Sequence, residues 1–288
     1  MPTLSQILFP VDFSEQTRAL APHVACMAAR YRARVTMLHV IEIPASVDPG
    51  WPDYGGLIDY AAIAEARKQQ LHSFLRSEFE TVSTTRVTME GDPGRMIAEF
   101  AEKEKADLIM MPTHGYGPFR RFLLGSVTAK VLHDAHCPVW TSAHMSEPSK
   151  PPTGYHNALC AVDLTSKSLP LMQWAAQFAR ERGATLKLVH AIPAATPPTS
   201  LDVDGDRFRA SLFEMANAAL ANLQSEAGTK LETVVAAGEV ATVIGEAAEE
   251  NHADLVIIGR GVMQETFGRM RTHVYSIIRE TPCPVISV

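Results

Sequence analysis

The chain has 288 residues, of which 46% are hydrophobic and 20% are charged, and its formal net charge is −6. This composition can bury a sizeable core in each of two domains, and the negative charge without long Lys or Arg runs argues against a nucleic-acid surface. The four cysteines form no C-x-x-C pair, so neither a zinc knuckle nor a disulfide framework is expected. No signal peptide or membrane insertion is predicted, and a cytoplasmic location is expected.

The first half of the chain, residues 1–145, predicts five strands that alternate with helices. An apolar run at 7–11 predicts a strand that ends at Asp12, and Ser14 is the expected N-cap of the helix that follows. The next strand, at 35–40, is apolar on both faces, which is typical of a parallel sheet covered by helices on two sides. Further strands are predicted at 85–89, 108–111 and 138–141, and further helices at 61–80, 93–105 and 126–135.

The second half repeats this order after a proline-containing linker at 146–155. Asp163 lies 151 residues after Asp12, and a Cys-Pro-Val strand recurs after 146 residues. Strands are predicted at 159–162, 185–190, 231–235, 255–259 and 285–288, and helices at 168–182, 206–227, 240–251 and 272–280. The repeat predicts two tandem α/β domains, 1–145 and 156–288, each doubly wound on a five-stranded parallel sheet of the Rossmann-like kind.

In a doubly wound sheet, ligands bind beyond the carboxyl ends of the strands, where the strand order reverses. Three segments of the first domain should converge at this edge because each follows a predicted strand. They are Asp12, Val40 and the loop after Met111. The sequence therefore places a candidate ligand site there.

The loop from Pro112 to Val127 has features of an anion site. It runs from a buried strand to the start of a helix, where the free N–H groups of Gly125, Ser126 and Val127 can receive an anion. Gly115 and Gly125 would allow close backbone approach to a phosphate. Glycines in such loops also serve turns that need a positive φ, so the pattern alone leaves both roles open.

With these motifs the chain resembles the universal stress protein family, as a tandem pair of domains over nearly its whole length. Nucleotide-binding members carry G-x-x-G, nine residues and then G-S or G-T, and Gly115, residues 116–124 and Gly125-Ser126 match this spacing. Pro112 departs from the motif because it replaces the first glycine, removes one backbone N–H and fixes φ. The resemblance implies an adenine-nucleotide alpha-hydrolase-like fold and ATP, with or without Mg²⁺, in the first domain.

The resemblance also implies an adenosine pocket at Asp12 and Val40. A carboxylate can accept from ribose hydroxyls or an adenine amine, and a branched apolar side chain can pack on the base. The alternatives are helix capping for Asp12 and core packing for Val40. The complete expected nucleotide site is Asp12, Val40, Pro112, His114, Gly115, Gly125, Ser126 and Val127.

The second half departs further from the family motif. Gly261 is followed by nine residues and then by Arg271-Thr272 in place of glycine and serine, and Ala191 stands where Val40 stands. Arg271 would place a bulky side chain where backbone should touch phosphate. No cofactor is therefore expected in the second domain, or only weak nucleotide binding.

No complete catalytic constellation is apparent. Ser126 stands where the family directs a hydroxyl toward phosphate, and no third group is placed to orient His114 as a base. His133 and His136 would need a third ligand from elsewhere to hold a metal, so no metal site is expected.

The resemblance implies a stress-response regulatory protein that signals nucleotide occupancy through its conformation or an unidentified protein partner. It also implies pairing of the two domains, or of two chains in a homodimer, through the last strand of each domain. A slow ATPase and a ligand-free interaction scaffold are the alternatives.

Overall fold

The computed structural model describes residues 4–42, 59–115, 124–143, 154–193, 205–260 and 270–288, with side chains described from 273 in the last segment. The chain divides into two compact units. The first comprises Met1–Trp140 and Met145–Pro152, and the second Thr141–His144 and Thr153–Val288. The predicted linker at 146–155 lies mostly outside the described residues.

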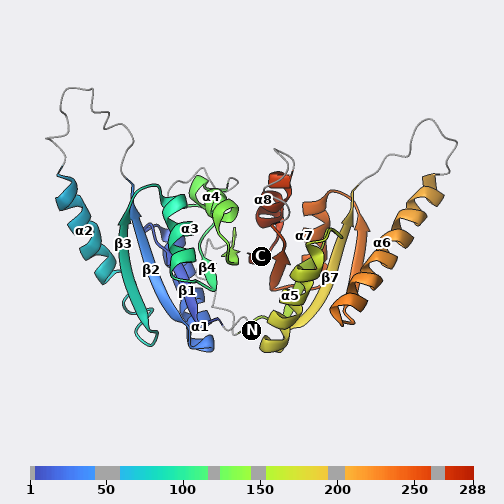
Figure 1. The fold of residues 1–288 in the computed structure, drawn as a ribbon, viewed down its shortest axis with the longest axis horizontal. Coiled ribbons are helices and arrows are strands. Elements are labelled where there is room, and N and C mark those ends of the chain that lie inside the picture. Colours follow the sequence, from blue (N-terminus) through green and yellow to red (C-terminus); the bar gives the residue numbers. More distant parts are fainter. Residues whose placement is uncertain (1–3, 43–58, 116–123, 144–153, 194–204, 261–269) are drawn as a thin grey trace, which may run out of the picture. The chain divides into compact units, whose positions relative to one another are not determined.

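The first unit alternates strands and helices along the chain (Figure 1). Its elements are β1 (Gln6–Pro10), α1 (Glu15–Tyr31), β2 (Arg34–Ile41), α2 (Tyr60–Ser73), β3 (Thr84–Glu90), α3 (Pro93–Lys103), β4 (Leu108–Met110), α4 (Ser126–Asp134) and β5 (Val139–Thr141). The strands are parallel in the order β3-β2-β1-β4-β5. The order reverses between β1 and β4, as in a doubly wound sheet.

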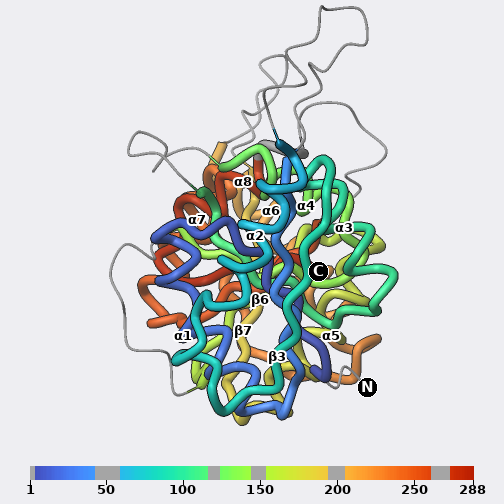
Figure 2. Tube along the Cα trace, turned by 90° about the vertical axis from the view of Figure 1, so that its left-hand side faces the viewer, coloured from blue at the N-terminus to red at the C-terminus, as the bar shows by residue number. Residues whose placement is uncertain are grey.

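The helices of the first unit cover both faces of its sheet. Viewed from the β3 edge, α1 and α2 lie on one side of β3, and α3 and α4 lie on the other (Figure 2). This arrangement follows from right-handed crossovers, because the chain moves one way along the sheet up to β3 and the other way afterwards. The central strands are buried on both faces, and Ile7, Leu8 and Phe9 are at most 1% exposed.

The helix predicted at 61–80 is shorter than expected, because α2 ends at Ser73. Phe74 is extended and Leu75 has a positive φ of 51°, which turns the chain out of the helix. Phe74, Leu75 and Phe79 are then buried in the core. The apolar periodicity beyond residue 73 therefore reflects core burial in a turn and not further helix.

The second unit has the same order of elements. They are β6 (Asn157–Ala161), α5 (Ser168–Arg182), β7 (Thr185–Ile192), α6 (Gly205–Ala227), β8 (Glu232–Ala237), α7 (Val240–Glu250), β9 (Leu255–Ile258), α8 (Met270–Glu280) and β10 (Val285–Ser287). Its parallel strands lie in the order β8-β7-β6-β9-β10, with α7 against α8 and α5 against α6. The predicted pair of doubly wound α/β domains is confirmed. No helix within the described segments is long and apolar enough to cross a membrane.

Candidate functional site

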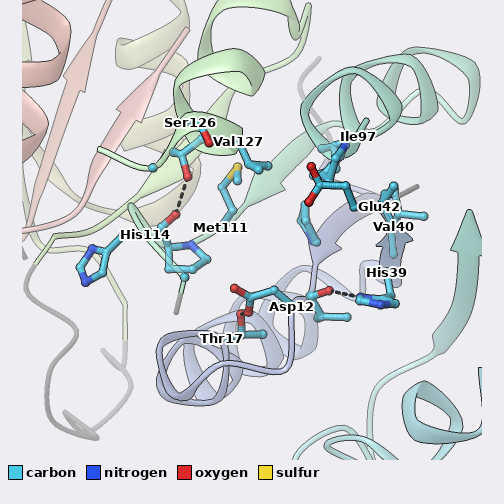
Figure 3. A pocket seen from close by; sticks show the side chains of 18 residues that line it. Asp12, Thr17, His39, Val40, Glu42, Ile97, Met111, His114, Ser126 and Val127 are labelled. Atoms are coloured by element: carbon cyan, nitrogen blue, oxygen red, sulfur yellow. Dashed lines mark hydrogen bonds between the residues drawn. The ribbon is translucent and has the colours of Figure 1, made fainter. Parts of the chain in front are cut away.

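A cavity of about 360 Å³ lies at the carboxyl ends of β1, β2 and β4, beside the start of α4 (Figure 3). This is the edge that the sequence predicts for a ligand. The cavity is lined by every residue predicted for the nucleotide site: Asp12, Val40, Pro112, His114, Gly115, Gly125, Ser126 and Val127. Residues that line it without a sequence signal include Thr17, Glu42, Ile97, Met111 and Thr128.

One carboxylate oxygen of Asp12 is held by the turn that leads into α1. Oδ1 accepts hydrogen bonds from the Ser14 backbone N–H at 3.0 Å, the Ser14 hydroxyl at 2.5 Å and the Thr17 hydroxyl at 2.6 Å. The turn is sharp because Phe13 has a φ of 66°. Ser14 is the N-cap of α1, as predicted, so Asp12 braces the cap without being the cap itself.

The other oxygen of Asp12 lies against Gly115. A β-carbon added at Gly115 would be 2.2 Å from Asp12 Oδ2, which is inside contact distance. In the described part of the chain, no donor forms a hydrogen bond with Oδ2. Asp12 therefore combines a fixed oxygen with one that can accept a hydrogen bond from a ligand in the cavity.

Neither loop glycine is there for a left-handed backbone. Gly115 has no φ in the positive range, and Gly125 has a φ of −62°. The alternative of a turn that needs a positive φ is therefore wrong for both positions. They provide space, since a β-carbon at Gly125 would lie 3.2 Å from the carbonyl oxygen of Thr113.

His39 fixes the end of β1 next to Asp12. Its Nδ1 lies 2.8 Å from the Val11 carbonyl oxygen, and its ring packs against Phe13 with centroids 4.4 Å apart. Burial lowers the pKa of His39, although the hydrogen bond to Val11 opposes this shift. A neutral ring that donates from Nδ1 satisfies this contact, so His39 acts in positioning the strand end.

The loop after β4 is clasped to α4 by two hydrogen bonds. The Gly125 N–H donates to the Thr113 carbonyl at 2.8 Å, and the Thr128 hydroxyl donates to the Pro112 carbonyl at 3.0 Å. Pro112 lacks the backbone N–H that the glycine of the family motif has, but its carbonyl oxygen accepts the hydrogen bond from Thr128 of α4. The buried His114, which is 8% exposed, lies in the same loop with Nδ1 3.0 Å from the Thr113 hydroxyl.

The N-terminus of α4 opens into the cavity. Its N-cap is Gly125, which offers no side chain to the first-turn amides. The backbone N–H groups of Ser126 and Val127 have no acceptor among the residues that the structure describes. Unpaired amides and the positive end of the helix dipole attract anions, so this end of the cavity suits phosphate.

The opposite side of the cavity is apolar with an acidic border. Val40 follows the buried part of β2, and Ile97 and Met111 are 4% exposed. Asp12 and Glu42 are the only charged side chains among the described residues of this lining. The charge distribution directs an anionic group away from the strand ends and toward α4.

The second unit has a cavity of about 300 Å³ at the corresponding place. Asp163 Oδ1 accepts from the Thr165 N–H at 3.0 Å, the Thr165 hydroxyl at 2.7 Å and the Ser168 hydroxyl at 2.9 Å. His190 Nδ1 lies 2.8 Å from the Val162 carbonyl oxygen. The strand-end turns of the two units are thus alike in each of these contacts.

The helix side of the second cavity differs. Val274 stands where Thr128 stands and Gly259 where Pro112 stands, so the hydroxyl that clasps the first loop has no counterpart. Residues 261–269 and the side chain of Arg271 lie outside the described part of the chain. The predicted obstruction by Arg271 therefore stays a prediction.

In the described part of both cavities, histidine, cysteine and carboxylate side chains do not form a metal cluster. No group of three such residues that could hold a metal ion occurs within the described segments.

Comparison with known proteins identifies both halves of the chain. The sequence profile of the Universal stress protein family matches residues 3–142 and 154–288. A universal stress protein of Methanocaldococcus jannaschii is 35% identical over 139 residues, which are 46% of this chain and 79% of the relative. A Na⁺/H⁺ antiporter of Synechocystis is 28% identical over 67% of this chain, but the match spans only 26% of the antiporter.

A similar fold is seen in the crystal structure of a universal stress protein from Archaeoglobus fulgidus. It is 19% identical and matches with a TM-score of 0.67 over 99% of this chain and 96% of that chain. This similarity concerns the fold alone, and it covers both units.

Proposed function

The chain belongs to the universal stress protein family, and from this premise we propose that its first unit binds ATP or a related adenine nucleotide. The observation that carries the proposal is that the eight residues singled out by the sequence line one cavity. A site assembled from three strand ends and a helix N-terminus matches the place where doubly wound sheets bind ligands.

The adenosine part of the ligand fits the strand side of the cavity. Val40, Ile97 and Met111 offer apolar contacts to a flat base, and burying the base against them is favourable. Asp12 Oδ2 is the acceptor for a ribose hydroxyl, because Oδ1 is already occupied by Ser14 and Thr17. We thus assign Asp12 a positioning role for the sugar.

The phosphate part fits the α4 side. The amides of Ser126 and Val127 can donate to phosphate oxygens, and the dipole of α4 stabilises their negative charge. Because Asp12 and Glu42 border the cavity, repulsion places the phosphates far from the strand ends. Where Mg²⁺ is present, it binds together with the nucleotide, coordinated by the phosphates.

We further propose that nucleotide occupancy is signalled to a protein partner, as expected of a stress-response regulator. We assign no nucleotide to the cavity of the second unit. Its cavity lacks the Thr128 hydroxyl clasp and carries Ala191 in place of Val40. The two units therefore have separate roles, with nucleotide in the first.

Isothermal titration of MgATP into the purified full chain tests the proposal. One saturable site per chain is expected, and Gly125→Arg, which copies the residue of the second unit, should remove it. Gly245→Ala is the matched control, because a β-carbon there comes no closer than 3.4 Å to its neighbours. Absence of saturable heat at millimolar MgATP in the unaltered chain would refute nucleotide binding.

A further inference from the structure

We propose that Glu42 determines which base the first cavity accepts, by taking a hydrogen bond from the exocyclic amine of adenine. The inference rests on the proposed function, because it concerns the same cavity and the same nucleotide. Glu42 lines this cavity but belongs to none of the motifs that the sequence singles out. Its role is therefore argued from its position in the fold.

The alternation of side chains along β2 directs Glu42 into the cavity. In an extended chain, every second side chain lies on the same face. Leu38, Val40 and Glu42 follow this spacing, and all three line the cavity. Their exposure increases along the row, because Leu38 is 1% exposed, Val40 is half-buried and Glu42 is exposed. Glu42 therefore stands at the mouth of the cavity, next to Val40.

The side chains beside Glu42 are those that the proposed function assigns to the base. Figure 3 shows Glu42 with Val40 and Ile97 on one side of the cavity, while Ser126 lies on the other. The phosphates at the start of α4 and the base at Val40 and Ile97 place the ribose between them. In adenine the ring that carries the amine is the one farther from the ribose. The amine is thus directed toward Glu42.

The carboxylate of Glu42 is available as an acceptor. It forms no ion pair and no hydrogen bond with any residue that the structure describes. An ionised carboxylate accepts hydrogen bonds and donates none, so it favours a base that presents an N–H group. Because Glu42 is exposed, solvent weakens the contact, and a modest preference for the amine is expected.

The second unit keeps the backbone of this strand end but lacks the carboxylate. The Gly91 N–H donates to the Ile41 carbonyl at 3.0 Å, and the Gly238 N–H donates to the Ile192 carbonyl at 3.0 Å. The matching row of side chains in the second cavity is Val189, Ala191 and Pro193. Pro193 has no side-chain acceptor, so the mouth of this cavity cannot recognise an amine in the same way.

Two nucleotides that differ only in the amine test the inference on the full-length chain. Purine riboside triphosphate has the ribose and phosphates of ATP, but hydrogen replaces the amine of the base. Calorimetry with Mg²⁺ should show that it binds about fivefold more weakly than ATP, as expected for one hydrogen bond to an exposed charged group. In Glu42→Ala the two affinities should become equal. Repulsion between Glu42 and the phosphates is the same for both nucleotides and cancels in their ratio.

Two further variants separate the hydrogen bond from a general effect of charge. Glu90 is exposed on β3 opposite Ile41 and lies outside the lining of the cavity. Glu90→Ala removes a carboxylate at neighbouring strand ends and should keep the ratio of the unaltered chain. Glu42→Gln keeps a carbonyl acceptor without the charge, so it should keep part of the preference for ATP.

The outcomes distinguish this inference from the proposed function. An equal preference for ATP in Glu42→Ala and in the unaltered chain would overturn the inference, and so would equal affinities of the two nucleotides in the unaltered chain. Loss of both nucleotides in Glu42→Ala would also overturn it, because recognition of the amine alone leaves purine riboside triphosphate bound. In each of these cases ATP still binds the unaltered chain, so the proposed function stands. If neither nucleotide binds the unaltered chain, the proposed function fails and the inference fails with it.

Discussion

The two cavities share their strand-end contacts and differ where the loop after the fourth strand meets the next helix. Asp12 and Asp163 each hold one oxygen with three hydrogen bonds from the turn that follows. On the helix side, the first unit has the contact between Thr128 and Pro112, while the second unit has Val274 and Gly259 at these positions. A strand-end turn that supports the fold can therefore persist while the residues on the helix side of the cavity change.

The difference also shows why a shared fold does not establish a shared ligand. The doubly wound sheet places both cavities at the same strand ends, but side chains decide what enters them. Replacement of Glu42 by Pro193 and the presence of Lys167 and Arg260 change the charge of the lining. Variants at matched positions can test whether these differences have the proposed consequences.

After Gly125→Arg, the largest effect on MgATP binding is expected for Gly115→Val in the first unit. A β-carbon at Gly115 would lie 2.2 Å from Asp12 Oδ2, so the carboxylate must leave its position. Loss of a hydrogen bond to a charged group costs about 1.5–3 kcal/mol, and MgATP affinity should fall by about 10- to 100-fold. Calorimetry measures the MgATP affinity, and Gly245→Ala in the second unit serves as the control. Full retention of MgATP affinity would remove Asp12 from the site.

A smaller loss of MgATP affinity than for Gly115→Val is expected for Asp12→Asn. Asp163→Asn is the matched variant in the second unit. The amide oxygen can still accept the hydrogen bonds of the turn, but an NH2 group, which cannot accept a hydrogen bond from a ribose hydroxyl, then replaces Oδ2. MgATP affinity should fall by about fivefold to tenfold in Asp12→Asn and stay unchanged in Asp163→Asn. Calorimetry measures both affinities. Equal losses of MgATP affinity in the two variants would contradict a nucleotide site confined to the first unit.

Thr128→Val makes the first unit resemble the second with almost no change of shape. Thr128 is buried, and its hydroxyl donates to Pro112 at 3.0 Å. Removal of this bond should lower the free energy of unfolding by about 1 kcal/mol and weaken MgATP binding by about threefold. Val274→Thr is the matched change in the second unit. Chemical denaturation and calorimetry on both variants measure the two effects. If Thr128→Val kept both the free energy of unfolding and the MgATP affinity of the unaltered chain, the hydrogen bond between Thr128 and Pro112 would be dispensable.

Much of the fold could be predicted because its local signals agree with its packing. Apolar runs marked the strands, Ser14 marked the start of α1, and the internal repeat indicated two units. The end of α2 could not be predicted, because apolar spacing past Ser73 is the same for a buried turn and a helix. The positive φ of Leu75, which ends the helical path, could not be predicted either, because leucine rarely adopts left-handed backbone.

The sequence predicted which residues line the candidate site, but it did not predict their detailed contacts. Strand ends in a parallel sheet must meet at one edge, so Asp12 and Val40 could be brought together with the loop after β4. The unequal roles of the two Asp12 oxygens depend on the positive φ of Phe13, which the residue type does not indicate. The contact between Asp12 and Gly115 joins residues about a hundred positions apart, and only the folded chain shows it.

The smallest expected effect concerns the ionisation of Asp163. Burial is the largest influence on it and raises its pKa, but the hydrogen bonds from Thr165 and Ser168 together lower the pKa below its usual value. A lowered pKa in the folded state stabilises the protein above the unfolded pKa of about 4, and this stability is lost as the pH falls through the folded pKa. Asp163→Asn should therefore destabilise the protein near neutral pH and have less effect in acid.

Chemical denaturation of the unaltered chain and Asp163→Asn at about pH 7 and about pH 3 measures this difference. Glu214→Gln, an exposed position on α6, is the control for loss of one surface carboxylate. The gap between the unaltered chain and Asp163→Asn should narrow toward acid, because protonation removes the charge that Thr165 and Ser168 stabilise. A gap that is equal at both pH values would mean that the retained turn of the second unit does not depend on the charge of Asp163.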